Sequence, residues 1–238
     1  MYGCICYISV SKLIEIIYKR TYRRKKIIKM YKFRHPFTCM VSGPTGSGKT
    51  FLVRDILKHY KHLIDIDVPK LKVLWAYGQW QSLYTQPIDN VKVDYVDGLP
   101  TEDEISGHDI VIIDDLMTEL GNNLKLSAIF TKGSHHKNIS VIFITQNLFH
   151  QGSQMRTIGL NCHYLIYMKS ARGRSQLRYL GRDLFTTKDF LPDVYDDATQ
   201  KPFSYIRIDL TQETPEKYRV CTNLIPDPLF RPLFYVPK

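Results

Sequence analysis

Residues Gly43-Pro44-Thr45-Gly46-Ser47-Gly48-Lys49-Thr50 form a glycine-rich loop that ends in a lysine and a threonine. An apolar run at 37–42 precedes the loop, and apolar residues at helical spacing follow it, so the loop joins a predicted strand to an amphipathic helix. The glycines let the backbone curve and approach a ligand closely. In this pattern Lys49 reaches the β- and γ-phosphates of a nucleotide, and the Thr50 hydroxyl coordinates Mg²⁺. The stretch therefore predicts a binding site for ATP and Mg²⁺.

Further strands are predicted along the chain from short apolar runs between turn residues. They lie at 71–77, 91–96, 110–113, 139–145 and 164–168. Acidic residues after Pro100 and Thr101 predict a helix start, and another helix is expected over Asn123–Thr131. This alternation predicts an α/β fold of the RecA/ASCE-like P-loop NTPase type, with a mainly parallel sheet and helices on both faces.

The C-terminal part of the chain has a different pattern. Runs at 205–210 and 218–222 predict two strands around Thr214-Pro215, as a hairpin or a C-terminal strand extension of the sheet. The prolines of the final stretch predict a segment without regular structure that packs along the surface.

Two acids, Asp114 and Asp115, follow the strand predicted at 110–113. Because ligands bind at the carboxyl edge of open α/β sheets, both acids are expected near the phosphate-binding loop. Asp114 is expected to hold the Mg²⁺ shell together with Thr50, and Asp115 to orient and polarise the attacking water. Glutamate is commoner in the second role, so the shorter Asp115 needs a closer water. The alternative interpretation is a pair of solvated acids that cap a strand.

The strand predicted at 139–145 is followed by an amide, Gln146. An amide at the carboxyl end of a core strand can hydrogen-bond the γ-phosphate or the attacking water. It would then report whether ATP is bound. The alternative is an amide that only caps a turn.

Charge and composition indicate how the chain is organised. With 238 residues, 44% hydrophobic and 24% charged, the sequence is that of one globular domain. Residues 1–32 contain nine basic residues and one acidic residue, so they account for +8 of the net charge of +10. We therefore expect a basic leader at 1–34, an ATPase domain at 35–226 and a proline-rich tail at 227–238. The remaining charge of about +2 is weak evidence that the domain itself binds nucleic acid.

The five cysteines are scattered and odd in number, which favours a reducing compartment. Cys39 and Cys162 lie in apolar runs and are expected to be buried. The apolar stretch near the N-terminus is interrupted by Lys12 and Glu15, and its positive charges follow the apolar residues. This order is not that of a signal peptide, and the stretch is too short to span a membrane. An intracellular protein that is neither secreted nor stably inserted in a membrane is expected.

Taken together, four segments resemble the FtsK–HerA superfamily, and within it the poxvirus-type genome-packaging ATPases of Polinton/Maverick elements and related DNA viruses. The resemblance runs from about His35 to Pro226. Its segments are the phosphate-binding loop, Ile112-Ile113-Asp114-Asp115-Leu116, Thr131-Lys132-Gly133-Ser134-His135-His136-Lys137-Asn138 and Phe143-Ile144-Thr145-Gln146-Asn147. The resemblance implies an oligomeric ring that hydrolyses ATP to drive double-stranded DNA into a capsid. Its expected partners are double-stranded DNA, further copies of the chain and a capsid or portal component, in the cytoplasm or nucleus of a host.

Ring ATPases commonly complete a neighbour's active site with an arginine. The candidates are Arg172, Arg174, Arg178 and Arg182. Spacing does not choose among them; Arg172 is the working assignment. A solvated basic helix face and contact with the DNA backbone are the alternatives. His135 and His136 lack an evident third metal ligand, so they are expected in a turn between a helix and a strand.

Three functions remain open from the sequence. A DNA-translocating motor is favoured by Asp115, Gln146 and the resemblance. A nucleoside or nucleotide kinase would not need Asp115 to activate water, although residues 172–182 could serve as an arginine-rich lid. A nucleotide-binding interaction module without hydrolysis is the third. Arguing against it are the intact residues Lys49, Thr50, Asp114 and Asp115.

Overall fold

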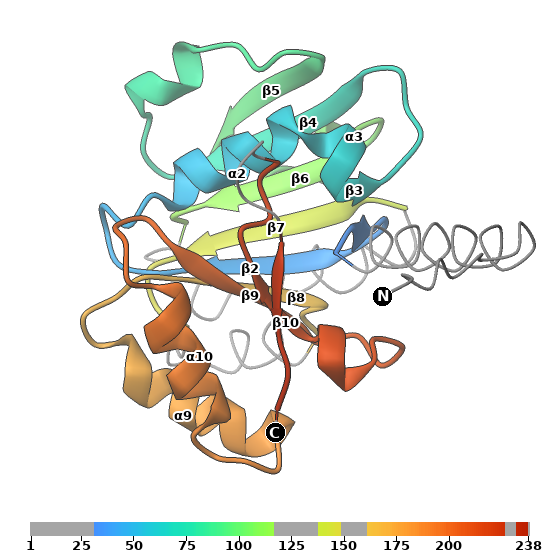
Figure 1. Cartoon of the computed structure of the whole chain (residues 1–238). Coiled ribbons are helices and arrows are strands. Elements are labelled where there is room, and N and C mark those ends of the chain that lie inside the picture. Colours follow the sequence, from blue (N-terminus) through green and yellow to red (C-terminus); the bar gives the residue numbers. More distant parts are fainter. Residues whose placement is uncertain (1–30, 117–137, 149–160, 227–231, 238) are drawn as a thin grey trace, which may run out of the picture.

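The computed structural model describes residues 31–116, 138–148, 161–226 and 232–237 (Figure 1). Within these residues the main feature is a nine-stranded sheet with the strand order β11-β10-β9-β8-β2-β7-β6-β4-β5. A separate two-stranded sheet pairs β1 (Phe33–Arg34) with β3 (Ile64–Asp65). The large sheet positions the candidate site.

Six adjacent strands of the large sheet pair in parallel. They are β2 (Thr38–Ser42), β4 (Leu71–Tyr77), β5 (Val91–Asp97), β6 (Ile110–Asp114), β7 (Ser140–Thr145) and β8 (Tyr164–Met168). Strands β2, β6, β7 and β8 are buried at every position, as expected for parallel strands covered on both faces. Strand β7 lies between β2 and β6. The predicted RecA/ASCE-like parallel core is confirmed.

Three antiparallel strands extend this core. Strand β9 (Tyr205–Asp209) pairs with β8, β10 (Val220–Thr222) pairs with β9, and β11 (Leu233–Tyr235) pairs with β10. The predicted C-terminal extension is confirmed, whereas the prediction that the final stretch has no regular structure is wrong for β11. Pro232 and Pro237 flank the three paired residues, and an edge strand tolerates proline at its ends because one side needs no hydrogen-bond donors.

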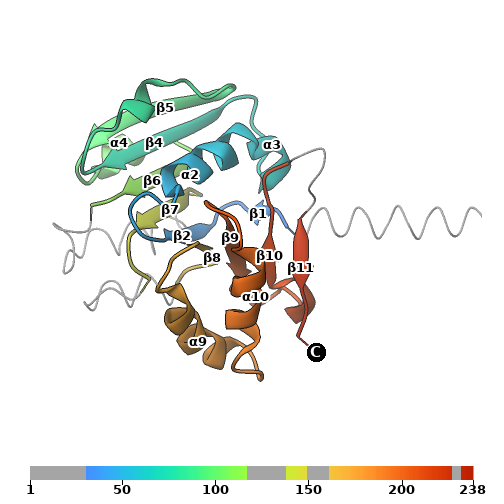
Figure 2. The same cartoon turned by 60° about the vertical axis from the view of Figure 1, so that its left-hand side comes forward.

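Helices cover both faces of the sheet, as predicted. On one face α2 (Lys49–Lys58) and α3 (Tyr60–Leu63) bury residues such as Ile56 and Leu63 against alternate strand residues such as Val41. On the other face α4 (Glu102–Ile105), α9 (Gly173–Leu184) and α10 (Phe190–Ala198) pack against a second set, which includes Met40. Figure 2 shows α9 and α10 together, away from α2.

The N-terminal boundary of the fold lies earlier than the sequence suggests. Phe33 and Arg34, assigned above to the basic leader, form β1, and the Phe33 side chain is 1% exposed. Its ring packs against Phe37 and Tyr164, with centroids 5.1 and 4.9 Å away. The folded domain therefore includes these two residues. The rest of the leader up to Met30 lies outside the described residues.

Several smaller predictions can also be compared with the structure. The acidic helix start is α4, where Thr101 and Glu104 form a reciprocal capping box. Cys39 and Cys162 are buried as expected. The predicted helix over Asn123–Thr131 and the histidines His135 and His136 lie outside the described residues. In the part of the chain that is described, no helix has the length and apolar character needed to cross a membrane.

Candidate nucleotide-binding site

The phosphate-binding loop connects β2 to α2 as the sequence predicts. Gly46 and Gly48 have φ values of 76° and 92°, a region that residues with a Cβ rarely adopt. At Gly43 an added Cβ would lie 2.6 Å from the Cβ of Met168, so only glycine fits against β8. Gly48 caps α2 with no side-chain hydrogen bond. The N–H groups of the first helical turn therefore point into the loop, where they can bind an anion.

Lys49 and Thr50 begin α2 and project into the loop from its helix side. The Lys49 ammonium donates to the carbonyl oxygens of Gly43 at 2.7 Å and Pro44 at 3.0 Å. Burial lowers the pKa of Lys49, and the carboxylates of Asp114 and Asp115 oppose this shift. The Lys49 ammonium is thus held between the loop and the two acids. In this position its positive charge can bind the phosphates of a nucleotide.

Asp114 ends β6 and is 3% exposed. Its Oδ2 accepts hydrogen bonds from the Thr50 hydroxyl at 3.3 Å and from the Tyr84 hydroxyl at 2.9 Å. Burial raises the pKa of Asp114, while these two donors lower it. Carboxylate and hydroxyl oxygens are the hard ligands that Mg²⁺ prefers, usually together with phosphate oxygens. The pair Thr50 and Asp114 therefore fits a Mg²⁺ ion that arrives with a nucleotide.

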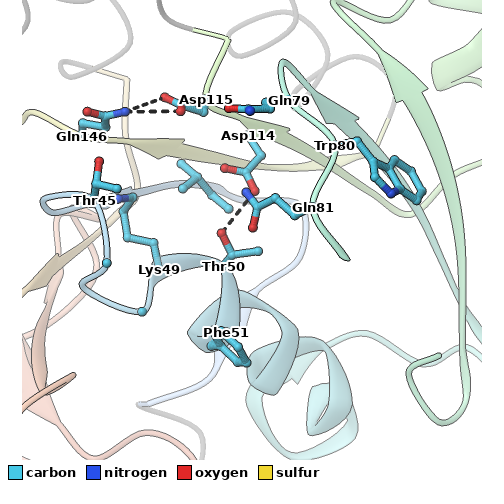
Figure 3. A pocket seen from close by; sticks show the side chains of 13 residues that line it. Thr45, Lys49, Thr50, Phe51, Gln79, Trp80, Gln81, Asp114, Asp115 and Gln146 are labelled. Atoms are coloured by element: carbon cyan, nitrogen blue, oxygen red, sulfur yellow. Dashed lines mark hydrogen bonds between the residues drawn. The ribbon is translucent and has the colours of Figure 1, made fainter. Parts of the chain in front are cut away.

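Asp115 and Gln146 are brought together from neighbouring strands. The Gln146 side-chain amide donates to both carboxylate oxygens of Asp115, at 3.1 and 3.2 Å (Figure 3). Asp115 has φ = 54°, a left-handed conformation that turns the chain sharply after β6. The turn is packed against Gly78, where an added Cβ would lie 2.8 Å from the Asp115 carbonyl oxygen. An exposed carboxylate oriented by an amide can accept a proton from water.

These residues line one cavity of about 420 Å³, a typical volume for a small-molecule site. The phosphate-binding loop contributes Thr45, Gly46, Gly48, Lys49 and Thr50, and the strand ends contribute Asp114, Asp115, Ile144 and Gln146. The cavity thus brings together most of the predicted site residues. It also has four lining residues that the sequence did not indicate, namely Phe51, Gln79, Trp80 and Gln81.

Tyr84 is a further residue that sequence reasoning missed. It lies in a 3₁₀ helix (Ser82–Thr85), and its ring is buried beside Trp75 and Tyr95. Burial and the Asp114 carboxylate raise the pKa of Tyr84, so its hydroxyl remains a hydrogen-bond donor. Its position follows from the pairing of β4 with β6, which places Tyr77 opposite Asp114 and residues 78–84 beside the carboxyl end of β6. No local sequence pattern shows this pairing.

The four candidate arginines lie on or just before α9, and none lines the cavity. Arg174 forms ion pairs with Asp193, at 3.2 Å, and Asp196 of α10, and Arg178 pairs with Asp189 at 3.3 Å. Arg172 is exposed at the position before α9, and its backbone N–H donates to the Ser170 hydroxyl at 3.3 Å. Two of the four candidates therefore contribute to packing between α9 and α10.

The fold and the loop define a RecA/ASCE-like P-loop α/β domain. No protein-family model matches the sequence, and no curated protein matches it. Among solved structures, the chain is similar to the DNA-packaging ATPase B204 of Sulfolobus turreted icosahedral virus, with 13% identity, 74% of this chain and 94% of that chain covered, and a TM-score of 0.47. The chain is also similar to the genome-packaging NTPase B204 of Sulfolobus turreted icosahedral virus 2 in complex with AMP. The sequence identity is 14%, the match covers 74% of this chain and 93% of that chain, and the TM-score is 0.44.

A third similar structure is the Legionella pneumophila ATPase DotB, with 15% identity and a TM-score of 0.40. The match covers 60% of this chain but only 43% of DotB. At these values no residue role is transferred from any of the three proteins.

Proposed function

We propose that this chain is an ATP-hydrolysing translocase that packages double-stranded DNA for a virus or a virus-like mobile element. One observation carries the hydrolytic part: the phosphate-binding loop, Asp114 and the hydrogen-bonded pair Asp115 and Gln146 line the same cavity. A site that only binds a nucleotide, or that passes a phosphoryl group to another acceptor, has no need of a carboxylate oriented for water.

In the proposed reaction, the loop N–H groups and Lys49 bind the β- and γ-phosphates. Thr50 and Asp114 hold Mg²⁺, which neutralises charge on those phosphates when it is bound. Asp115 accepts a proton from the attacking water as the water's oxygen bonds to the γ-phosphorus and the bond to the β-phosphate oxygen breaks. Gln146 holds the Asp115 carboxylate in place and detects the γ-phosphate.

The DNA-packaging part of the proposal rests on the resemblance of the four sequence segments to the packaging ATPases of Polinton/Maverick elements and related viruses. It implies a ring of identical subunits that acts on double-stranded DNA with a capsid or portal component. In such a ring Arg172 would reach the nucleotide of the neighbouring subunit, since Arg174 already pairs with acids of α10 and Arg178 with Asp189, the residue before α10. We propose residues 33–226 as the core of the ATPase domain.

The direct test is ATP turnover by the purified full chain with and without double-stranded DNA. We expect DNA to accelerate phosphate release, and Lys49→Ala to abolish it. Lys58→Ala, on the exposed side of the last turn of α2, is the matched control and should behave as wild type. DNA-independent transfer of the phosphate to a nucleoside would instead support a kinase, and ATP binding without any turnover would support a nucleotide-binding module.

A further inference from the structure

Four residues that line the cavity take no part in the proposed hydrolysis, namely Phe51, Gln79, Trp80 and Gln81. Phe51 and Trp80 are 63% and 51% exposed. Single exposed hydrophobic residues are ordinary, but two large rings in one ligand cavity indicate a binding surface. In Figure 3, Trp80 lies on one side of Asp114 and Thr50, and Lys49 lies on the other.

The Trp80 ring is fixed by its neighbours although half of it is exposed. Three tyrosine rings contact it at steep angles: Tyr77 at 5.2 Å and 72°, Tyr84 at 5.4 Å and 81°, and Tyr95 at 5.6 Å and 70° between centroids and ring planes. Such edge-to-face contacts stabilise one ring orientation. A ligand that stacks on Trp80 would therefore meet a preorganised surface and order few new side chains.

The loop side and the Trp80 side of the cavity differ in chemistry, so together they fit a ligand with two different parts. The loop side offers N–H groups and the Lys49 ammonium for phosphates, whereas the Trp80 side offers aromatic surface. A nucleoside triphosphate joins a polyphosphate to a flat base that stacks on aromatic rings. We propose that the base of the bound nucleotide stacks on Trp80, an inference that rests on the proposed function. Phe51, in the first turn of α2, lines the same cavity.

The selectivity of this base site depends on the side chains around it. Gln79 and Gln81 both line the cavity, but in Figure 3 Gln79 lies beside Asp115 and Gln81 reaches toward Asp114 and Thr50, so selectivity for the base rests mainly on stacking. Stacking is tolerant of base identity. The site should therefore discriminate weakly between bases, and ATP and GTP should bind within about tenfold of each other.

The test compares ATP with inorganic tripolyphosphate, which has the phosphates but no base. Both are titrated by calorimetry, with Mg²⁺, into the wild-type full chain and into Trp80→Ala, Trp80→Phe and Phe203→Ala. Phe203 is exposed and lies against the other side of the loop, 3.2 Å from where a Cβ on Gly48 would be, but it does not line the cavity. It probes the alternative position for the base.

We expect Trp80→Ala to weaken ATP binding about tenfold or more, to leave tripolyphosphate binding unchanged, and Trp80→Phe to restore most of the affinity. Equal ATP affinity in wild type and Trp80→Ala would overturn the base site while leaving the proposed function intact. A selective loss of ATP binding in Phe203→Ala would also overturn it, because the base would then lie on the other side of the loop. Wild-type protein that binds neither ligand would overturn both proposals.

A second measurement follows tryptophan fluorescence. The chain has two tryptophans, and Trp75 is fully buried, so only Trp80 can stack on a base. ATP should quench the wild-type emission more than tripolyphosphate does, and the difference should vanish in Trp80→Ala. An equal response to both ligands in wild type would contradict stacking.

Discussion

The Tyr84 ring packs beside Trp75, Trp80 and Tyr95, and its hydroxyl contacts the acid that we assign to Mg²⁺. The hydroxyl donates to Asp114 at 2.9 Å, and the Thr50 hydroxyl donates to the same carboxylate oxygen at 3.3 Å. Groups that hydrogen-bond a metal-binding carboxylate orient it and tune its affinity for the metal. The sequence gives no sign of this role, because a tyrosine in a short apolar segment is ordinarily part of a core.

We predict that Tyr84→Phe raises the Mg²⁺ concentration needed for half-maximal ATP turnover about tenfold, because Asp114 loses its shortest side-chain hydrogen bond. Nucleotide binding without Mg²⁺ should not change. Tyr95→Phe is the control, since its ring stacks on Tyr84 with centroids 5.1 Å apart but its hydroxyl does not contact Asp114. The same Mg²⁺ dependence in wild type and Tyr84→Phe would show that Tyr84 only packs.

At the scale of elements, the buried Arg207 side chain joins the N-terminal part of the domain to the sheet extension. Arg207 of β9 is 0% exposed and donates to Asp209 at 3.0 Å and to the Tyr31 carbonyl at 2.6 Å. Its guanidinium lies over the rings of Phe33 and Tyr164, 5.4 and 5.0 Å from their centroids. The contact anchors β1 to the sheet extension.

We predict that Arg207→Met lowers the free energy of unfolding by roughly 3–5 kcal/mol, because Asp209 is left buried without its cation. Adding Asp209→Asn should recover part of the loss. Arg174→Ala removes the exposed pairs between α9 and α10 and should cost at most about 1 kcal/mol. Urea unfolding measures all three, and a loss for Arg207→Met no larger than that for Arg174→Ala would contradict a structural role for the buried pair.

The parallel strands could be predicted because each is a continuous apolar run between turn residues. Leu71–Tyr77 and Tyr164–Met168 match the predicted bounds. The pair β1 and β3 has two residues in each strand, too few for a period of two to be visible. Strand β11 was not predicted because the prolines near it disfavour a strand and only three of its residues are paired. These residues are extended because they pair with β10.

At the scale of the whole molecule, the sheet order brings together parts that are distant in sequence. Ser42 lies opposite Thr145 in the pairing of β2 with β7, and Asp114 opposite Ile144 in that of β6 with β7. The loop, the two acids and Gln146 could therefore be predicted at one edge from their positions after strands. Trp80 and Gln81 could not, because their relevance depends on β4 being adjacent to β6, which no local pattern encodes.

The proposed ring leads to a prediction about Arg172. Alone, Arg172→Ala and Lys49→Ala should both fail to hydrolyse ATP. Mixed in equal amounts they should regain part of the turnover, because Lys49→Ala subunits supply an intact Arg172 to neighbours with an intact loop. Arg178→Ala is the control and should be active alone, because the Arg178 side chain already pairs with Asp189. Mixtures no more active than the separate variants would contradict an arginine that acts across subunits.

The central claim is that Asp115, oriented by Gln146, activates water in the nucleotide site. The most direct test is a single-turnover measurement of ATP hydrolysis by Asp115→Asn, alongside its affinity for ATP. We predict that hydrolysis falls by about 10² or more while the affinity stays within about threefold of wild type. Normal hydrolysis by Asp115→Asn would contradict the account.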